Sequence, residues 1–145
     1  MNRILIALVI MLCAGAVCIK SQAPLAAASF PAPVQTQEGK IIYEQTCMPC
    51  HQIDAGGVPG LNPPLWKSPY VEGSSARLIG IVLQGLNDGV EISGESYSNP
   101  MPAFSGVLKD KEIADVLTYL RSHFGNKAGP VSLLQVSRIR QRLKK

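Results

Sequence analysis

The chain carries two cysteines and a histidine in one short run, Cys47-Met48-Pro49-Cys50-His51. Residues three apart lie on the same side of a helical turn, so both thiols can reach one partner molecule. Thiols at this spacing can add to the two vinyl groups of a haem, and the histidine that follows can bind the iron. The run therefore predicts one covalently attached haem c, with Cys47 and Cys50 as thioether residues and His51 as an axial ligand.

Two other interpretations of these residues are open at this point. A thioredoxin-like dithiol also has Cys-x-x-Cys, but it needs βαβ units around the motif, whereas residues 37–46 have the pattern of an amphipathic helix. A structural zinc site needs four ligands. After residue 28, the chain has no cysteine outside the motif and, besides His51, only His123. A haem uses all three residues of the motif together, so we favour it.

The first 28 residues have the organisation of a secretory signal peptide. Asn2-Arg3 gives a positive start, residues 4–19 are uncharged and mostly aliphatic, and Ala26-Ala27-Ala28 is a small-residue cleavage site. The apolar run has 16 residues, whereas a membrane-spanning helix needs about 20. We therefore predict export to the periplasm, with an uncleaved N-terminal membrane anchor as the alternative. Residues 29–36 contain two prolines and predict an extended linker.

Residues 37–131 predict one mostly helical domain, followed by a basic C-terminal helix or tail at residues 132–145. Helices are expected from about Gln37 into the cysteine motif, after Ser74-Ser75, from Asp110 and after Ser132. Residues 54–69 and 90–104 predict loops, the second with room for a short hairpin. The predicted fold class is all-α, with three to five helices wrapped around one covalently bound haem.

The charge of the chain is unevenly distributed. Its formal net charge is +4, yet residues 29–137 carry seven basic against ten acidic residues. The last eight residues hold five cations, namely Arg138, Arg140, Arg142, Lys144 and Lys145. Such a tail is either a solvated helix end or a docking surface for an acidic partner or an anionic membrane. We expect no nucleic-acid partner.

The second axial ligand of the iron is predicted to be Met101. After residue 28 the chain has two methionines, and Met48 lies between the two thioether cysteines, from where it cannot reach across a haem. Prolines on both sides of Met101 restrict its backbone. His123 is the alternative ligand, and a methionine that only fills a gap is the other alternative. A thioether ligand raises the reduction potential and fills the coordination sphere, which argues against catalysis by this chain alone.

These features together resemble class I cytochromes c, in particular the small cytochrome c subunits or domains of bacterial periplasmic dehydrogenases. The resemblance covers about residues 37–143 and has four carrying segments. They are Cys47 to His51, Gly60-Leu61-Asn62-Pro63-Pro64-Leu65, Met101-Pro102-Ala103-Phe104 and Glu112-Ile113-Ala114-Asp115-Val116-Leu117-Thr118-Tyr119-Leu120-Arg121.

The resemblance implies further site residues. A proline carbonyl after the haem motif accepts a hydrogen bond from the second nitrogen of the histidine; Pro63 matches that position, with Pro59 and Pro64 as alternatives. Leu65 is expected to pack on the haem ring. Tyr97 and Trp66 either bond a propionate or line the haem crevice, with packing in the core as the alternative for both. Arg77 either pairs with a propionate or is a solvated helix residue.

The resemblance also implies how two helices meet. The N-terminal helix is expected to cross the helix that begins at Asp110, with Gly39 allowing the close approach and Tyr43 packing between them. The chain departs from the family at Lys109, where relatives often have Ser or Thr as a helix cap, so we expect a weaker cap there.

The resemblance implies a periplasmic single-electron carrier and not an enzyme. Its partners would be a dehydrogenase as electron donor and a terminal oxidase or another cytochrome as acceptor. The alternative function is a haem enzyme or a gas or redox sensor, in which the Met101 ligand is displaceable. Membrane contact would occur through the basic tail or an uncleaved N-terminus.

Overall fold

The structure is a computed structural model that describes residues 32–145, with side chains from residue 36 onward. The predicted signal peptide lies outside the described residues, as does the start of the predicted linker. A continuous helical segment opens the described part and consists of α1 (Ala32–Ile42), the π-helical turn η1 (Tyr43–Cys47) and α2 (Met48–His51). The helix therefore begins at Ala32, inside residues 29–36, where an extended linker was expected. Pro33 falls in the first turn, where its missing N–H costs no hydrogen bond.

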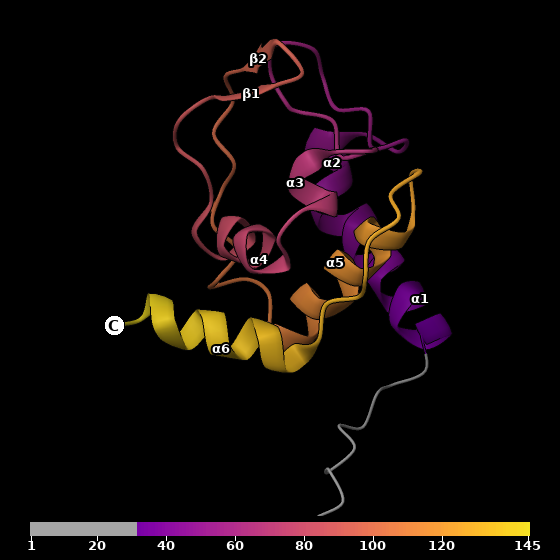
Figure 1. The fold of residues 1–145 in the computed structure, drawn as a ribbon, viewed down its shortest axis with the longest axis vertical. Coiled ribbons are helices and arrows are strands. Elements are labelled where there is room, and N and C mark those ends of the chain that lie inside the picture. The colour runs from indigo at the N-terminus through magenta and orange to yellow at the C-terminus, as the bar shows by residue number, and fades with distance from the viewer. Residues whose placement is uncertain (1–31) are drawn as a thin grey trace, which may run out of the picture.

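Helix α5 (Asp110–Ser122) lies in the middle of the molecule and crosses α1, which lies at its edge (Figure 1). A Cβ atom on Gly39 would overlap the carbonyl oxygen of Asp115 and lie 2.7 Å from Tyr119 Cβ. Only glycine therefore allows this crossing. Tyr43 is 1% exposed, and its ring lies 5.9 Å from the ring of Tyr119 and 5.2 Å from that of Phe124. Tyr43 therefore packs between the two helices, as the resemblance implied.

Two serine-capped helices follow the first loop. Helix α3 (Pro69–Glu72) begins after Ser68, whose hydroxyl accepts from Tyr70 N–H, at the end of the predicted 54–69 loop. Helix α4 (Ser75–Gln84) begins after Ser74, whose hydroxyl accepts from Arg77 N–H. Serine is favoured at helix starts because its hydroxyl accepts a hydrogen bond from a backbone N–H that would otherwise be unpaired.

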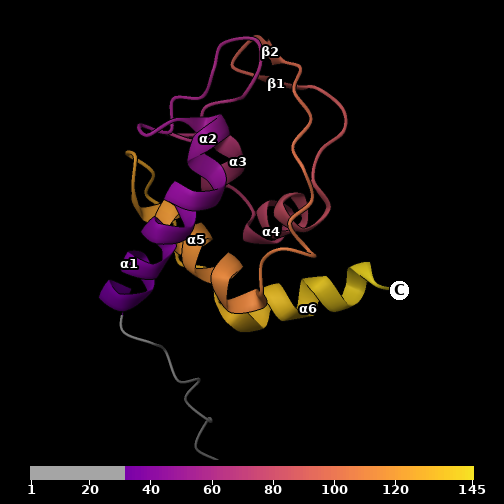
Figure 2. The same cartoon turned by 180° about the vertical axis from the view of Figure 1, so that it is seen from behind.

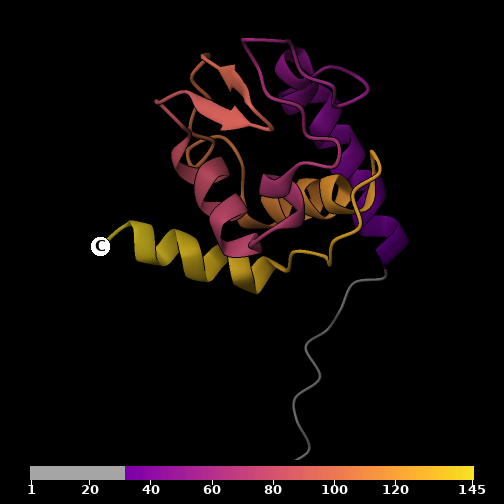
Figure 3. The same cartoon turned by 45° about the horizontal axis from the view of Figure 1, so that its top comes forward.

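The expected short hairpin is present. Strands β1 (Val90–Ile92) and β2 (Glu95–Tyr97) are antiparallel, with Val90 opposite Tyr97. The two turn residues, Ser93 and Gly94, have φ of 55° and 83°. Positive φ at both positions is the geometry that matches the twist of a two-residue hairpin. Figure 3 shows the hairpin above α4, at the side of the molecule opposite α1.

The start of α5 has only half of a capping box. The backbone N–H of Lys109 donates to Glu112 Oε2 at 2.7 Å. The ammonium group of Lys109 has no lone pair, so its side chain cannot accept from the helix in return. This agrees with the weaker cap expected at this position.

Helix α6 (Leu133–Leu143) lies against α4 and α5, and its C-terminal end points away from the domain (Figures 1 and 2). Its Ser132–Gln135 capping box is complete, because the Gln135 side chain accepts from Ser132 N–H and the Ser132 hydroxyl accepts from Gln135 N–H. Val136 is fully buried and Ile139 packs on the core.

The described residues thus form a mostly helical fold with five helical segments and one hairpin, which confirms the predicted fold class. Among residues 32–145, no helix is long and apolar enough to cross a membrane.

Candidate functional site

One large cavity lies between the cysteine motif, α4, α5 and the segment that carries Met101. Together with the open solvent at its mouth, the cavity encloses about 1210 Å³ of space. Its walls are mostly apolar, with Leu65, Val71, Leu78, Ile81, Val82, Leu86, Val90, Ile92, Phe104, Leu108, Val116, Leu117 and Leu120 among the lining residues. A planar, hydrophobic macrocycle fits such walls.

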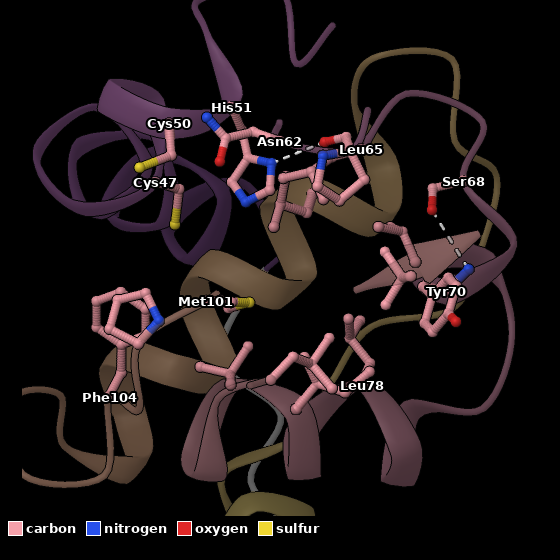
Figure 4. Close-up of a pocket in the computed structure, with 18 of the residues that line it drawn as sticks. Cys47, Cys50, His51, Asn62, Leu65, Ser68, Tyr70, Leu78, Met101 and Phe104 are labelled. Atoms are coloured by element: carbon pink, nitrogen blue, oxygen red, sulfur yellow. Dashed lines mark hydrogen bonds between the residues drawn. The ribbon is translucent and has the colours of Figure 1, made fainter. Parts of the chain in front are cut away.

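Both cysteines of the motif line this cavity, where η1 passes into α2. Cys47 is half-buried and Cys50 is exposed, and both thiols lie at the wall of the cavity (Figure 4). Burial, and then the neighbouring Cys50, raises the pKa of Cys47 to about 12. A disulfide-exchange nucleophile needs the opposite shift. Within the described residues, no three His, Cys, Asp or Glu side chains gather into a site for a metal ion.

His51 points into the cavity from α2 (Figure 4). Its Nδ1 lies 2.9 Å from the carbonyl oxygen of Pro63. Because a carbonyl can only accept, Nδ1 carries the hydrogen in this bond and Nε2 keeps its lone pair. Burial lowers the pKa of His51, against a smaller opposing effect of the Pro63 carbonyl, so the ring is neutral near pH 7. A neutral imidazole with a free Nε2 is the form that binds a metal.

Met101 enters the same cavity from the loop that follows the hairpin (Figure 4). Its backbone is fixed by an isolated bridge to Leu86, in which Met101 N–H donates to Leu86 O at 2.8 Å and Leu86 N–H donates to Met101 O at 2.9 Å. Three residues later, Phe104 N–H donates to Val82 O at 2.9 Å. The loop therefore lies along the end of α4 without being helical itself.

Gly85, the residue that ends α4, makes this close approach possible. Its φ is +75°, which favours glycine. A Cβ atom there would overlap the Met101 carbonyl oxygen and lie 2.9 Å from Ala103 N. Gly57 has a similar place on the other side of the site, since its φ is +70° and a Cβ atom would lie 2.7 Å from the Pro63 carbonyl oxygen.

The loop before Pro63 and the loop before Met101 are tied together, which sequence reasoning missed. Ser98 N–H donates to Gly60 O at 3.1 Å and Asn99 N–H donates to Leu61 O at 3.0 Å. The Asn99 side-chain amide donates to Asn62 Oδ1 at 3.2 Å. The histidine side and the methionine side of the cavity thus hold each other in place.

The other expected site residues divide into two groups. Leu65 lines the cavity, and its backbone is held by Leu65 N–H donating to Ala55 O and by the Asn126 side chain donating to Leu65 O. Tyr97 and Trp66 instead line an adjoining cavity, which shares Pro64, Ser68 and Ile92 with the large one. The Tyr97 hydroxyl donates to Glu95 Oε2 at 2.7 Å, and Tyr97 is not among the residues that line the large cavity.

Arg77 and His123 are not among the residues that line the large cavity. The guanidinium of Arg77 stacks 4.5 Å over the ring of Tyr70, a cation–π contact at the rim. His123 is exposed just beyond α5, with its ring 4.2 Å from that of Tyr119 and its Nδ1 2.9 Å from the Tyr119 carbonyl oxygen. Met101, and not His123, therefore shares the cavity with His51.

Comparison with known proteins agrees with this geometry. The family model "Cytochrome c" matches residues 36–124. The chain is 38% identical over 95 residues to cytochrome c-552 of Thermus thermophilus, which covers 61% of this chain and 70% of that one. It is 33% identical over 106 residues to the cytochrome c subunit of the quinone alcohol dehydrogenase of Gluconacetobacter polyoxogenes, covering 70% of this chain and 22% of that one.

A further relative is the cytochrome c subunit of the gluconate 2-dehydrogenase of Pantoea cypripedii, 34% identical over 96 residues, covering 64% of this chain and 21% of that one. The chain thus spans about a fifth of the length of these dehydrogenase subunits. With an apolar cavity, two thiols at its wall and the family match over most of the described residues, the chain belongs to the cytochrome c family, whose members are electron carriers that bind haem c covalently.

Proposed function

We propose that this protein is a periplasmic single-electron carrier in which Cys47 and Cys50 hold the haem and His51 and Met101 are the axial ligands. When bound, the haem supplies an iron that alternates between the ferrous and ferric states. The observation that carries the proposal is that the His51 imidazole and the Met101 side chain point into the same apolar cavity, with both thiols at its wall.

The histidine is prepared for its role by Pro63. The Pro63 carbonyl accepts the Nδ1 hydrogen, which fixes the ring orientation and leaves Nε2 free to donate its electron pair. Because the same bond makes the imidazole more basic, it strengthens the ligand. Gly57 supports this bond by allowing its backbone to pass close to the Pro63 carbonyl.

Backbone hydrogen bonds hold Met101 in position. The Leu86–Met101 bridge and the Phe104–Val82 hydrogen bond fix the loop on both sides of the thioether. Apolar side chains such as Leu86 and Phe104 exclude water from the cavity, and a neutral thioether in a dry site favours the ferrous state. If His51 and Met101 both bind the iron, a bound haem would have no position open to a substrate, as expected of a carrier rather than of the enzyme or sensor alternative.

Visible spectroscopy of the ferric protein tests the ligand assignment. We expect a low-spin spectrum with a weak red methionine-sulfur-to-iron band, lost in Met101→Ala and retained in His123→Ala. Carbon monoxide should bind the ferrous Met101→Ala protein rapidly and the wild type poorly. Immediate and complete binding by the wild type would refute the carrier proposal.

The proposed compartment and partners have separate support. The positive and apolar N-terminal segment supports export. Similarity to cytochrome subunits of quinone alcohol and gluconate 2-dehydrogenases and to a subunit of a cbb3-type cytochrome c oxidase supports a dehydrogenase as electron donor and an oxidase or another cytochrome as acceptor. Cell fractionation with N-terminal sequencing tests the compartment, because export predicts a periplasmic protein that starts near Ser29. Purification of the native protein with its bound partners tests the donor; copurification with no redox protein would count against it.

A further inference from the structure

Arg140 makes an unusual set of contacts for a residue in a basic tail. Its Nε lies 2.5 Å from Asp110 Oδ1, one terminal nitrogen donates to Ser105 O at 2.5 Å, and the other donates to Leu108 O at 2.8 Å. The Arg140 side chain is 16% exposed and that of Asp110 is 26% exposed. One guanidinium therefore binds three acceptors that lie within six residues of each other. Arg138, exposed on the same helix, makes no hydrogen bond or ion pair with the other residues that the structure describes.

The helix that carries Arg140 is itself fixed to the core. Val136 and Val131 are buried, and the backbone of Val131 exchanges two hydrogen bonds with the Thr118 hydroxyl on α5, at 3.0 and 3.1 Å. Figures 1 and 2 show α6 beside the N-terminal end of α5. Arg140 thus reaches the 105–110 segment from a rigid support rather than from a mobile tail.

The segment that Arg140 holds continues directly from the methionine loop. Phe104 N–H is bonded to Val82, and the turn that follows is closed by Leu108 N–H donating to Phe104 O at 2.9 Å. The loop with Met101 is therefore fastened at one end by the Leu86 bridge and at the other by Arg140. If the Arg140 contacts are removed, two carbonyls and a carboxylate lose a charged donor, and the 105–110 segment loses its attachment to α6, so only the Phe104–Val82 hydrogen bond holds the far side of the loop.

We propose that Arg140 is a positioning residue for Met101: α6, through the guanidinium fork, holds the 105–110 segment and so keeps the thioether at the iron. This inference rests on the proposed function, in which Met101 is a ligand. Arg140 lies beyond residues 36–124, which the family model matches. The contacts that hold the 105–110 segment therefore come from a helix outside the matched region. Lysine cannot replace arginine here, because its single ammonium lacks the planar arrangement of donors that three separate acceptors require.

The test uses the full-length, haem-loaded protein with Arg140→Gln, Arg140→Lys and, as a matched control, Arg138→Gln, which removes the same charge from the exposed face of the same helix. An external ligand such as cyanide binds only molecules whose Met101 has left the iron, so its affinity reports the open fraction. Loss of three charge-assisted hydrogen bonds should raise cyanide affinity by about tenfold or more in both Arg140 variants. The Arg138→Gln protein should behave as the wild type.

Amide hydrogen exchange gives a readout that does not depend on the ligand. In the Arg140 variants the amides of Met101, Phe104 and Leu108 should exchange faster, while those of α1 and the middle of α5 should not. Wild-type cyanide affinity and unchanged exchange in Arg140→Gln would overturn the inference, and so would Arg140→Lys that behaves as the wild type, since charge alone would then suffice. Failure of the proposed function is distinguishable, because it would remove the sulfur-to-iron band from the wild type itself.

Discussion

Replacing Gly85 by alanine should release the methionine loop. The backbone at this position has φ +75° and ψ −175°, a region that is nearly exclusive to glycine and costs another residue about 1–3 kcal/mol. The added Cβ atom would also overlap the Met101 carbonyl oxygen, so the chain must move there. That movement breaks the two hydrogen bonds of the Leu86–Met101 bridge, each of which contributes about 0.5–1.5 kcal/mol. We therefore expect a total loss of about 2–6 kcal/mol.

The measurement is denaturant unfolding of the haem-loaded protein, together with the methionine-sulfur-to-iron band of the ferric form. Gly80→Ala is the matched control, because Gly80 lies within α4 and an added Cβ atom meets nothing within 4 Å. That variant should be as stable as the wild type or up to about 1 kcal/mol more stable, as alanine is the better helix former. An unfolding free energy and a band in Gly85→Ala equal to those of the wild type would refute the reasoning.

Three further predictions concern other parts of the molecule. Gly57→Ala should displace the Pro63 carbonyl and weaken its hydrogen bond with His51. The measurement is the reduction potential, which should change. Gly60→Ala is the control, because no atom lies within 4 Å of a Cβ atom added there. Burial holds the pKa of Tyr43 above its ordinary value. The contribution of Tyr43 to the unfolding free energy is therefore present below about pH 10 and is lost as the pH rises further. Tyr43→Phe should remove this pH dependence of the unfolding free energy, and an unchanged dependence would contradict the prediction. The last test neutralises the exposed cations of the basic tail, Arg138, Arg142, Lys144 and Lys145, and leaves Arg140 intact. If the tail docks to an acidic partner, this variant should transfer electrons more slowly at low salt and at the wild-type rate at high salt.

Local sequence signals predicted most of the helices correctly. Serine caps at Ser74 and Ser132 and the acidic start at Asp110 each stand where a helix begins in the structure. These signals act within one turn, so a single sequence contains all the information they need. The start of α1 was missed because proline was interpreted as a sign of extended chain, whereas the first turn of a helix also accepts it.

The arrangement of the site depends on contacts that no local signal contains. The hydrogen bonds from Ser98 and Asn99 to the 60–62 loop join residues 37 or 38 positions apart. Glycine at positions 57 and 85 was visible in the sequence, but the backbone atoms that require it belong to other segments. Tyr97 was expected near the haem because an aromatic hydroxyl can bond a propionate; in the structure its partner is Glu95, two residues away.

The burial of Val131 and Val136 limits how short a stably folded fragment of this protein can be. Both side chains are almost completely covered, and they belong to residues after the matched family region. A fragment trimmed to residues 36–124 would leave the surfaces of α4 and α5 that receive these valines open to water, and it would lose the Thr118 hydrogen bonds as well. We therefore expect a stable fragment to extend beyond residue 124, at least to Val136.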